Sequence, residues 1–156
     1  MIMTELQIRA QFSMWAVVSA PMLISGSITK MTTETLATYS NKAVIAVSQD
    51  PLGHGGDRVA GGDMAGCHGK SANCTNVWSK ALSTGGKAVI FLNTGSAPAK
   101  VCVTMAAAGI TGAADTLRAT DLWTDAVVTE DAVSGKELCS TDALPAEGGM
   151  QMLTVQ

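Results

Sequence analysis

Apolar side chains in the first twenty residues recur at helical spacing and on more than one side of the chain. This pattern predicts a largely buried helix over residues 4–19. Thr4 and Gln7 have the spacing of a capping box, so we expect the helix to begin directly after Thr4. Pro21 ends the helix, and residues 22–25 then form a short apolar run with the character of a buried parallel strand.

A second helix is expected from Thr32 to about Tyr39, with Thr32 as its N-cap and Glu34 placed to favour the helix dipole. Residues 43–47 are a further apolar stretch, which ends at the turn residues Asp50 and Pro51. A lone strand between helices cannot satisfy its backbone hydrogen-bonding groups without neighbouring strands. The first fifty residues are therefore predicted to be one end of an α/β barrel or sheet whose remainder lies upstream.

From His54 onward the pattern changes to a glycine-rich connection followed by short β-rich runs. The predicted strands cover residues 76–80, 87–93, 100–105, 117–122, 126–129 and 151–155. Short strands at spacings near ten residues are typical of an antiparallel β-sandwich. Residues 106–114 are the exception, because their alanines would also suit a helical turn between strands.

Composition supports a folded chain and excludes some partners. The sequence is 47% hydrophobic and 15% charged, which permits a sizeable core and argues against disorder. The net charge is −3 without a basic run, so we expect no nucleic-acid partner. The longest apolar run, residues 12–24, is too short and too interrupted for a membrane span. A signal peptide is the rival interpretation of this run, although it lacks a basic segment ahead of it.

The chain has four cysteines, Cys67, Cys74, Cys102 and Cys139, and three disulfide pairings are open. Cys67 and Cys74 lie in a glycine-rich loop that a local disulfide could close, whereas Cys102 and Cys139 fall in strand-like stretches. His68 beside Cys67 raises the alternative of a zinc site, but the spacing does not fit the common zinc motifs. We therefore expect no metal and no cofactor.

Asn73, Cys74 and Thr75 match the N-glycosylation pattern, which together with the even cysteine count favours a secreted or lysosomal/vacuolar protein. Other candidate chemistry is sparse. The carboxylates in or near turns are Asp50, Asp57, Asp63, Asp121, Asp125, Glu130 and Asp131. We interpret them as exposed turn residues, since none adjoins an apolar pocket that would separate two carboxyl pKa values for acid and base roles.

His54 and His68 are loop histidines without a recognisable nucleophile nearby, so the sequence predicts no catalytic residue. Trp15 is predicted to be a core residue of its helix. Trp78 and Trp123 are expected in the core or at the interface between barrel and sandwich rather than on a sugar-binding surface.

Seven segments carry a resemblance to a known family. In chain order they are residues 11–16 (QFSMWA), 20–25 (APMLIS), 31–36 (MTTETL), 41–53 (NKAVIAVSQDPLG), 77–83 (VWSKALS), 121–123 (DLW) and 144–150 (LPAEGGM). They resemble the C-terminal part of glycoside hydrolase family 27, the α-galactosidases or melibiases and their α-N-acetylgalactosaminidase relatives. The departures are Ser48 for a usual Asn, Glu147 for a usual His, Gly26-Ser27 for a polar pair, and the insertion with Cys67 and Cys74.

The resemblance implies an organisation into parts. Residues 1–53 would be the last helix–strand–helix segment of a (β/α)8, or TIM, barrel. Residues 54–75 would be a linker, and 76–156 the C-terminal β-sandwich domain. Barrel enzymes place their active sites at the carboxyl ends of the strands, so Ser25 and Gly26 are the residues expected to approach one.

The family's reaction is the retaining hydrolysis of terminal α-linked galactose by two aspartates, and both would lie upstream of this chain. The chain alone is therefore expected to be inactive, with its α-galactoside or oligosaccharide substrate bound through the missing barrel. An upstream barrel chain or a second copy is the expected partner. The alternative is a non-catalytic β-sandwich subunit, derived from such an enzyme, with a binding or structural role.

Overall fold

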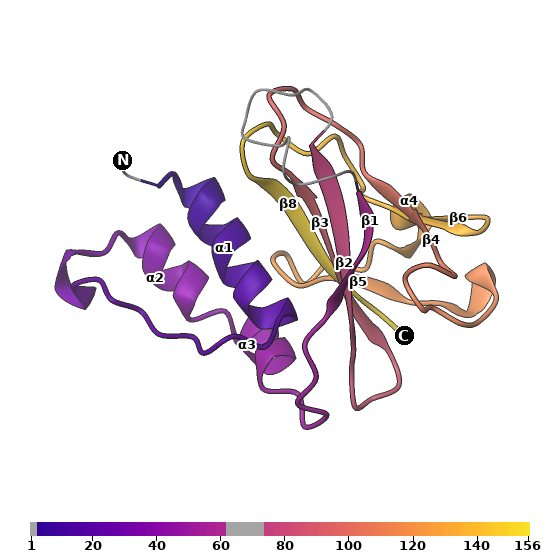
Figure 1. The fold of residues 1–156 in the computed structure, drawn as a ribbon, viewed down its shortest axis with the longest axis horizontal. Coiled ribbons are helices and arrows are strands. Elements are labelled where there is room, and N and C mark those ends of the chain that lie inside the picture. Colours follow the sequence, from indigo (N-terminus) through magenta and orange to yellow (C-terminus); the bar gives the residue numbers. More distant parts are fainter. Residues whose placement is uncertain (1–2, 62–73) are drawn as a thin grey trace.

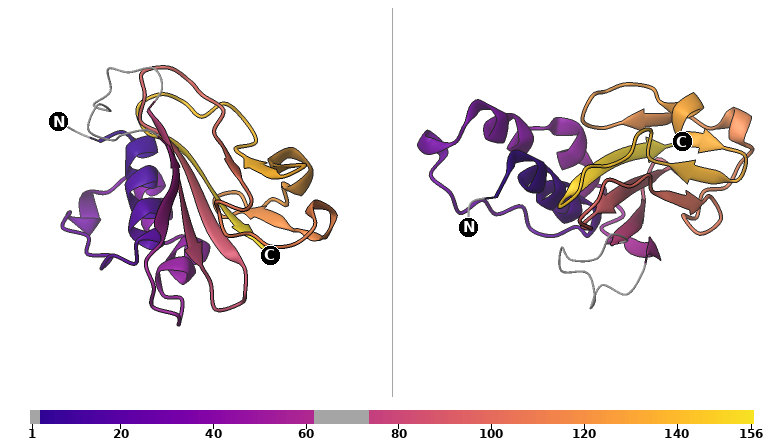
Figure 2. Two further views of the ribbon diagram at one scale, coloured as in Figure 1. Left: turned by 45° about the vertical axis from the view of Figure 1, so that its right-hand side comes forward. Right: turned by 90° about the horizontal axis from the view of Figure 1, so that it is seen from above.

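The computed structural model describes residues 3–61 and 74–156 and arranges them in three layers. A helical segment covers one face of a five-stranded sheet, and a smaller three-stranded sheet lies on the opposite side (Figures 1 and 2). None of the helices in the described ranges combines the length and hydrophobicity that crossing a membrane requires.

Side-chain caps set the starts of the three α-helices that form the helical segment. The segment contains α1 (Glu5–Val17), the 3-10 turn η1 (Ile28–Lys30), α2 (Thr33–Tyr39) and α3 (Lys42–Ser48). Thr4 Oγ1 accepts from the amide of Gln7 at 3.2 Å, and Gln7 Oε1 accepts from the amide of Thr4 at 3.0 Å. The predicted capping box is thus confirmed. Thr32 caps α2 as predicted, and Asn41 caps α3.

The strand predicted at residues 22–25 is wrong for this chain. No strand is assigned there, and Leu23 is 80% exposed. The reason is physical: a strand needs neighbours for its backbone groups, and the described residues place none beside this run. Met22 alone packs partly against the core, while Leu23, Ile24 and Ser25 face outward.

The second part of the chain is an antiparallel β-sandwich, as predicted. Its strands are β1 (Asp57–Gly61), β2 (Thr75–Ala81), β3 (Lys87–Asn93), β4 (Cys102–Thr104), β5 (Ala119–Asp121), β6 (Val133–Ser134), β7 (Glu137–Cys139) and β8 (Gly149–Val155). The larger sheet has the order β1-β2-β3-β8-β5 and the smaller one β4-β7-β6. Residues 105–109 form turns, and 114–116 form a 3-10 turn, where the alanines had favoured a helical turn.

The strands of the sandwich differ from the prediction in three places, one of which is the hairpin of β6 and β7, where no strand was predicted. Residues 57–61, inside the predicted linker, form β1 and pair with β2. Residues 126–129 do not form a strand: Val127 makes an isolated bridge to Thr120, and the helix α4 (Thr129–Ala132) begins directly afterwards. Glu130 and Asp131 lie in the first turn of α4, where the helix dipole favours acidic side chains.

The five-stranded sheet is apolar on both faces, which explains the unbroken hydrophobic run in β3. Val89 and Phe91 point into a core shared with the smaller sheet. Ala88 and Ile90, which alternate with them, belong to a second core shared with the helical segment. We call these the sandwich core and the shared core.

Candidate functional site

The junction between the helical segment and the sheet contains the second cluster of buried apolar residues in the described part of the chain. Phe12, Ala16 and Val17 of α1 and Val44 and Val47 of α3 are buried there, against Leu82, Ala88, Ile90 and Met152 of the sheet. The ring of Phe12 also meets the ring of Tyr39 of α2 edge to face, with 5.3 Å between centroids. The three helices are therefore packed together on one face of the sandwich.

The three tryptophans all lie at this junction, partly buried against the shared core. Trp123 Nε1 donates to Ser13 Oγ of α1 at 3.1 Å, and the guanidinium of Arg9 lies 4.9 Å from the centre of its ring. Trp78 Nε1 donates to Asn76 Oδ1 at 2.8 Å. The contacts of Trp123 hold α1 on the sandwich, whereas the hydrogen bond of Trp78 lies within β2; both indoles have the packing role that was expected.

Lys80 is a buried charged residue at this junction that the sequence did not point to. Its side chain is fully buried, and its ammonium group donates to the carbonyl of Val47 and to Ser19 Oγ. Burial lowers the pKa of Lys80, and the nearby carboxylate of Asp50 acts in the opposite direction. The available signal was the strand period, because Lys80 shares a face of β2 with Trp78.

Asp50 joins the same junction from the turn after α3. Its carboxylate accepts from the amide of Leu52 and from both the amide and the hydroxyl of Ser83. Partial burial acts to raise the pKa of Asp50, but the hydrogen bonds from Ser83 and Leu52 outweigh it and lower the pKa below 3.8.

A groove of about 560 Å³ runs between α1 and the end of the sheet. On the helix side it is lined by Gln7, Ala10, Gln11 and Met14, and on the sandwich side by Leu92, Thr94, Glu147 and Gly148. Gln7 Nε2 donates to the carbonyl of Glu147 at 3.3 Å and so bridges the two sides. Both parts of the molecule would contact whatever fills this groove.

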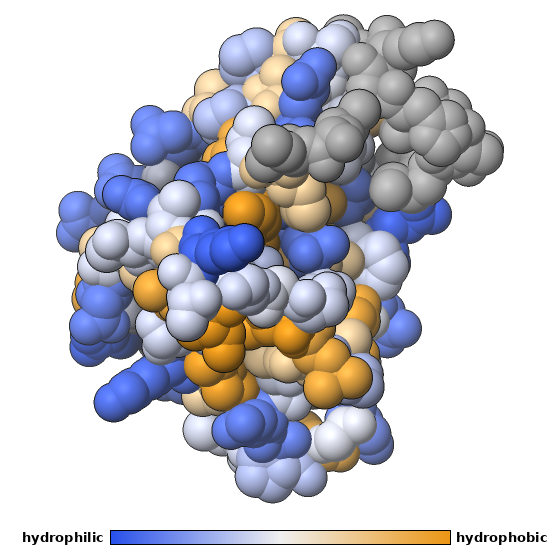
Figure 3. All heavy atoms as spheres, turned by 90° about the vertical axis from the view of Figure 1, so that its left-hand side faces the viewer, coloured by the Kyte–Doolittle hydropathy of each residue, from blue (hydrophilic) through white to orange (hydrophobic). Residues whose placement is uncertain are grey.

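The outer face of the helical segment is rich in exposed apolar side chains, and Figure 3 shows the hydrophobic area on this side of the molecule. Among the large apolar residues, Leu23 is 80% exposed and Ile28 68% exposed, with Ile24 and Leu36 near 41%. Exposed apolar area of this kind is more typical of a contact surface than of a solvent-facing one.

The carboxylates do not form a catalytic pair in the described part of the chain. Asp57, Asp125, Glu130 and Asp131 are exposed as predicted. For Asp121 the prediction of an exposed turn residue is wrong, since it is buried. Its oxygens accept from the amides of Trp123 and Thr124 and from Nε2 of Gln151. A side chain engaged in this way orders the turn after β5 and ties it to β8.

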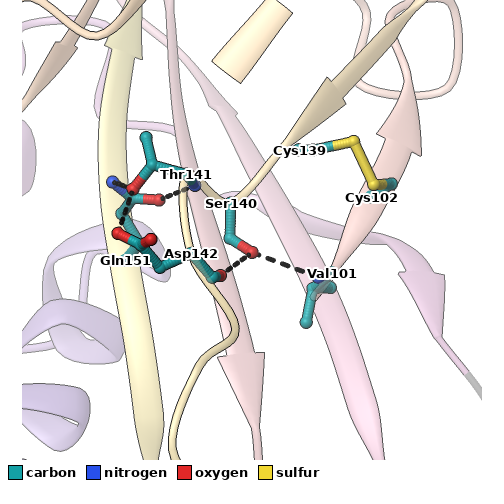
Figure 4. The surroundings of a disulfide bond; sticks show 7 residues. All are labelled: Val101, Cys102, Cys139, Ser140, Thr141, Asp142 and Gln151. Atoms are coloured by element: carbon teal, nitrogen blue, oxygen red, sulfur yellow. Dashed lines mark hydrogen bonds between the residues drawn. A yellow bond between two sulfur atoms is a disulfide. The ribbon is translucent and has the colours of Figure 1, made fainter. Parts of the chain in front are cut away.

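Cys102 and Cys139 face each other on the paired strands β4 and β7 and form a disulfide with an S–S distance of 2.07 Å. Beyond the bond, Ser140 Oγ accepts from the amide of Val101 and donates to the carbonyl of Asp142, as Figure 4 shows. Cys74 is also disulfide-bonded. In the described ranges, the one group of metal-binding residue types is Cys102, Cys139 and Glu137, and its two sulfurs are joined to each other.

The remaining candidate residues from the sequence lie outside the described ranges or on exposed loops. Cys67, His68, Asn73 and Asp63 lie outside the described residues. His54 is exposed, and its backbone carbonyl accepts from Ser19 Oγ at 3.1 Å. Ser25 and Gly26 lie exposed in the connection between α1 and α2.

Comparison with known proteins assigns both parts of the chain. Residues 72–154 match the profile described as the α-galactosidase C-terminal β-sandwich domain, and residues 2–50 match the profile described as α-galactosidase A. α-Galactosidase 3 of Arabidopsis thaliana is 36% identical over 141 residues, covering 90% of this chain and 30% of the relative. The α-galactosidase of Coffea arabica is 34% identical over 154 residues, covering 99% of this chain and 37% of the relative.

Solved structures show the same fold. α-Galactosidase I of Mortierella vinacea superposes with a TM-score of 0.80 at 21% identity, over 99% of this chain and 36% of that one. The α-galactosidase of Saccharomyces cerevisiae with raffinose gives a TM-score of 0.76 at 20% identity, over 100% of this chain and 44% of that one. The chain spans about a third of the length of the relatives it matches in sequence.

Proposed function

Because this chain belongs to the α-galactosidase family through its C-terminal β-sandwich domain, we propose that it forms the C-terminal part of a retaining glycoside hydrolase acting on terminal α-linked galactose. The observation that carries the proposal is the helical segment. It has no core of its own, shares one with the sandwich, and leaves an apolar outer face uncovered.

That outer face fits the end of a (β/α)8 barrel. In such a barrel, residues 22–25 would pair with strands on both sides, and the apolar side chains of Leu23 and Ile24 would enter the barrel wall. Ser25 and Gly26 would then lie at the carboxyl end of this strand, where barrel enzymes build their active sites. The groove between α1 and the sandwich would be filled by the same missing part, which would contact both regions.

Retaining hydrolysis needs two carboxyl groups about 5–5.5 Å apart, one to attack the anomeric carbon and one to protonate the leaving oxygen. Among the described carboxylates, Asp121 is engaged by hydrogen bonds from its own turn and from Gln151, and the exposed Glu130 and Asp131 are adjacent on the first turn of α4, where the helix dipole favours acidic side chains. We therefore assign the catalytic pair to sequence beyond these 156 residues, and expect the chain alone to be inactive.

The experiment is complementation. The chain is assayed with a chromogenic α-galactoside alone, and again when joined to the upstream part of the Coffea arabica relative, which the chain matches over nearly its whole length. We expect hydrolysis only from the joined protein. A second joined protein with Ala10→Arg in the groove should lose activity, because the charge would be buried there. Hydrolysis by the chain alone would contradict the proposal.

A secreted or lysosomal/vacuolar location is part of the proposal. The supporting observation is the Cys102–Cys139 disulfide, because structural disulfides persist in oxidising compartments. Glycosylation at Asn73 would agree with it, and a mobility shift on glycosidase treatment of the secreted protein tests it. An unshifted, intracellular product would count against this location.

The second candidate is a non-catalytic subunit with a binding or structural role. It is favoured by the sandwich core, which is complete without any residue of the helical segment. Calorimetric titration of the chain with galactose and α-galactosyl oligosaccharides separates the two candidates. Measurable affinity of the chain alone would support a binding module, and the absence of affinity would favour the proposal that the chain is part of a hydrolase.

A further inference from the structure

Lys80 stands where the sandwich meets the ends of two helices. Val47, whose carbonyl accepts from Lys80, lies in the last turn of α3, and Ser19 follows the C-cap of α1. The last carbonyls of a helix have no intrahelical donors and carry partial negative charge. The buried ammonium group therefore supplies a donor to a carbonyl at the end of α3, with the polarity that this helix end favours, and also donates to the hydroxyl that follows α1.

The backbone around this ammonium group is closely packed. Ser19 adopts φ 54. Its hydroxyl, which accepts from Lys80, donates in turn to the carbonyl of His54 at 3.1 Å. The amide of Gly56 donates to the carbonyl of Val17 at 2.7 Å. A Cβ at Gly56 would lie 2.7 Å from Val17 Cγ1 and 2.8 Å from the carbonyl oxygen of Ser79, so only glycine fits between α1 and β2.

We infer that Lys80 is a positioning residue, whose ammonium group clamps the C-terminal ends of α1 and α3 onto the sandwich and so fixes the orientation of the helical segment. The shared core supplies apolar contact, which is not directional. The hydrogen bonds of Lys80 are directional, and they join three segments: the end of α1, the end of α3 and strand β2. This role is independent of the proposed hydrolase activity, because it is a property of the chain itself.

Local hydrogen exchange in the full chain tests the clamp. Lys80→Met keeps the apolar stem but leaves the Val47 carbonyl and the Ser19 hydroxyl without their buried donor. We expect amide exchange at Gly56 and Ala20 to accelerate by about ten- to a hundredfold, while exchange at Ile90 in β3 stays within about twofold. Lys100→Met, at an exposed lysine, is the matched control and should change none of these rates.

Two further measurements distinguish hydrogen bonding by the ammonium group of Lys80 from packing by its apolar stem. In protein labelled with ¹⁵N-lysine, a buried, hydrogen-bonded ammonium group should give a slowly exchanging side-chain signal near pH 6, absent in Lys80→Met. Lys80→Cys provides the rescue: alkylation in mild denaturant with 2-bromoethylamine restores an ammonium group at lysine length, whereas iodoethane adds a neutral chain.

We expect the aminoethylated protein to regain the slow exchange at Gly56 and Ala20, and the ethylated one to remain fast. Equal recovery with both reagents would show that the stem alone suffices and would overturn the inference. Unchanged exchange in Lys80→Met, or a missing ammonium signal in the native chain, would overturn it as well. If Lys80→Met fails to fold, the ammonium signal of the native chain still decides.

Discussion

The β-sandwich and the helical segment differ in where each finds its apolar core. Val89, Phe91, Leu138 and Leu153 lie in a core made by two sheets that face each other, without help from the helices. The buried residues of the helices, such as Phe12 and Val44, meet side chains of the sheet instead. One region is therefore predicted to be stable by itself, whereas the other depends on a surface that it does not contain.

Dividing the chain should have the largest effect. Residues 1–53 alone are expected to lose their helical signal, because helices of 13 and 7 residues are too short to persist in water without packing. Residues 54–156 alone should keep a strand signal and a cooperative thermal transition. Far-UV circular dichroism of both pieces checks this, and a helical spectrum from residues 1–53 would remove the contrast between the regions.

Truncating one phenylalanine in each core sharpens the comparison. Phe91→Ala should lower the free energy of unfolding of the whole chain by about 3–5 kcal/mol, since it opens a cavity in the sandwich core. Phe12→Ala should instead make the helical signal disappear at lower urea than the strand signal. Urea titrations followed at two wavelengths test this, and coincident transitions in Phe12→Ala would show that the regions unfold as one.

Removing the disulfide should act on the sandwich alone. Cys102 and Cys139 are 37 residues apart, and replacing both by alanine is expected to cost about 2–4 kcal/mol. The strands that the bond joins have only three residues each, so the small sheet depends on it more than the large one. Hydrogen exchange should rise first at Val103 and Leu138; a rise confined to the helices would contradict this assignment.

The sequence predicted the elements whose signals are local. The capping box at Thr4, the N-cap at Thr32 and the apolar runs of β2, β3 and β8 depend on a few adjacent residues, and all are present. Strand β1 was missed because glycines surround it and its burial is slight. The run at residues 22–25 has the composition of a strand, but a strand is a property of its neighbours as well.

The candidate site was harder to predict for the same reason. The burial of Asp121 depends on Gln151, thirty residues later in the chain, and the clamp at Lys80 depends on helix ends up to 61 residues earlier. No local pattern around either residue encodes these partners. The sequence does place Lys80 on the same strand face as Trp78. Lys80 is therefore a polar residue within an apolar surface.

A smaller effect is expected from the cap of α1. Thr4→Ala removes the acceptor for the amide of Gln7 and should lower stability by about 1 kcal/mol. The loss should appear in the helical signal before the strand signal, because α1 belongs to the dependent region. Thr33→Ala, at an exposed position of α2, is the control and should have at most half the effect; equal losses would remove the cap as the cause.

The smallest effect concerns acid, and it acts on the link between the two regions. Asp50, after α3, accepts from Ser83 in the turn between β2 and β3, and these hydrogen bonds hold the pKa of its carboxyl below 3.8. A group whose pKa is lower in the folded state stabilises that state above its unfolded pKa, and this contribution is lost as the pH falls through the folded pKa.

The melting temperature of the native chain should therefore exceed that of Asp50→Asn near pH 5, and the difference should shrink below about pH 3.8 as Asp50 takes up its proton. Asp57→Asn, at an exposed carboxylate of β1, reports the general effect of removing one negative charge. If the link between the regions depends on the ionised carboxylate, acid should loosen the helical segment while the strand signal persists. A difference in melting temperature between the native chain and Asp50→Asn that stays constant down to pH 2 would contradict this. It would mean that Asp50 does not join the two regions through its charge.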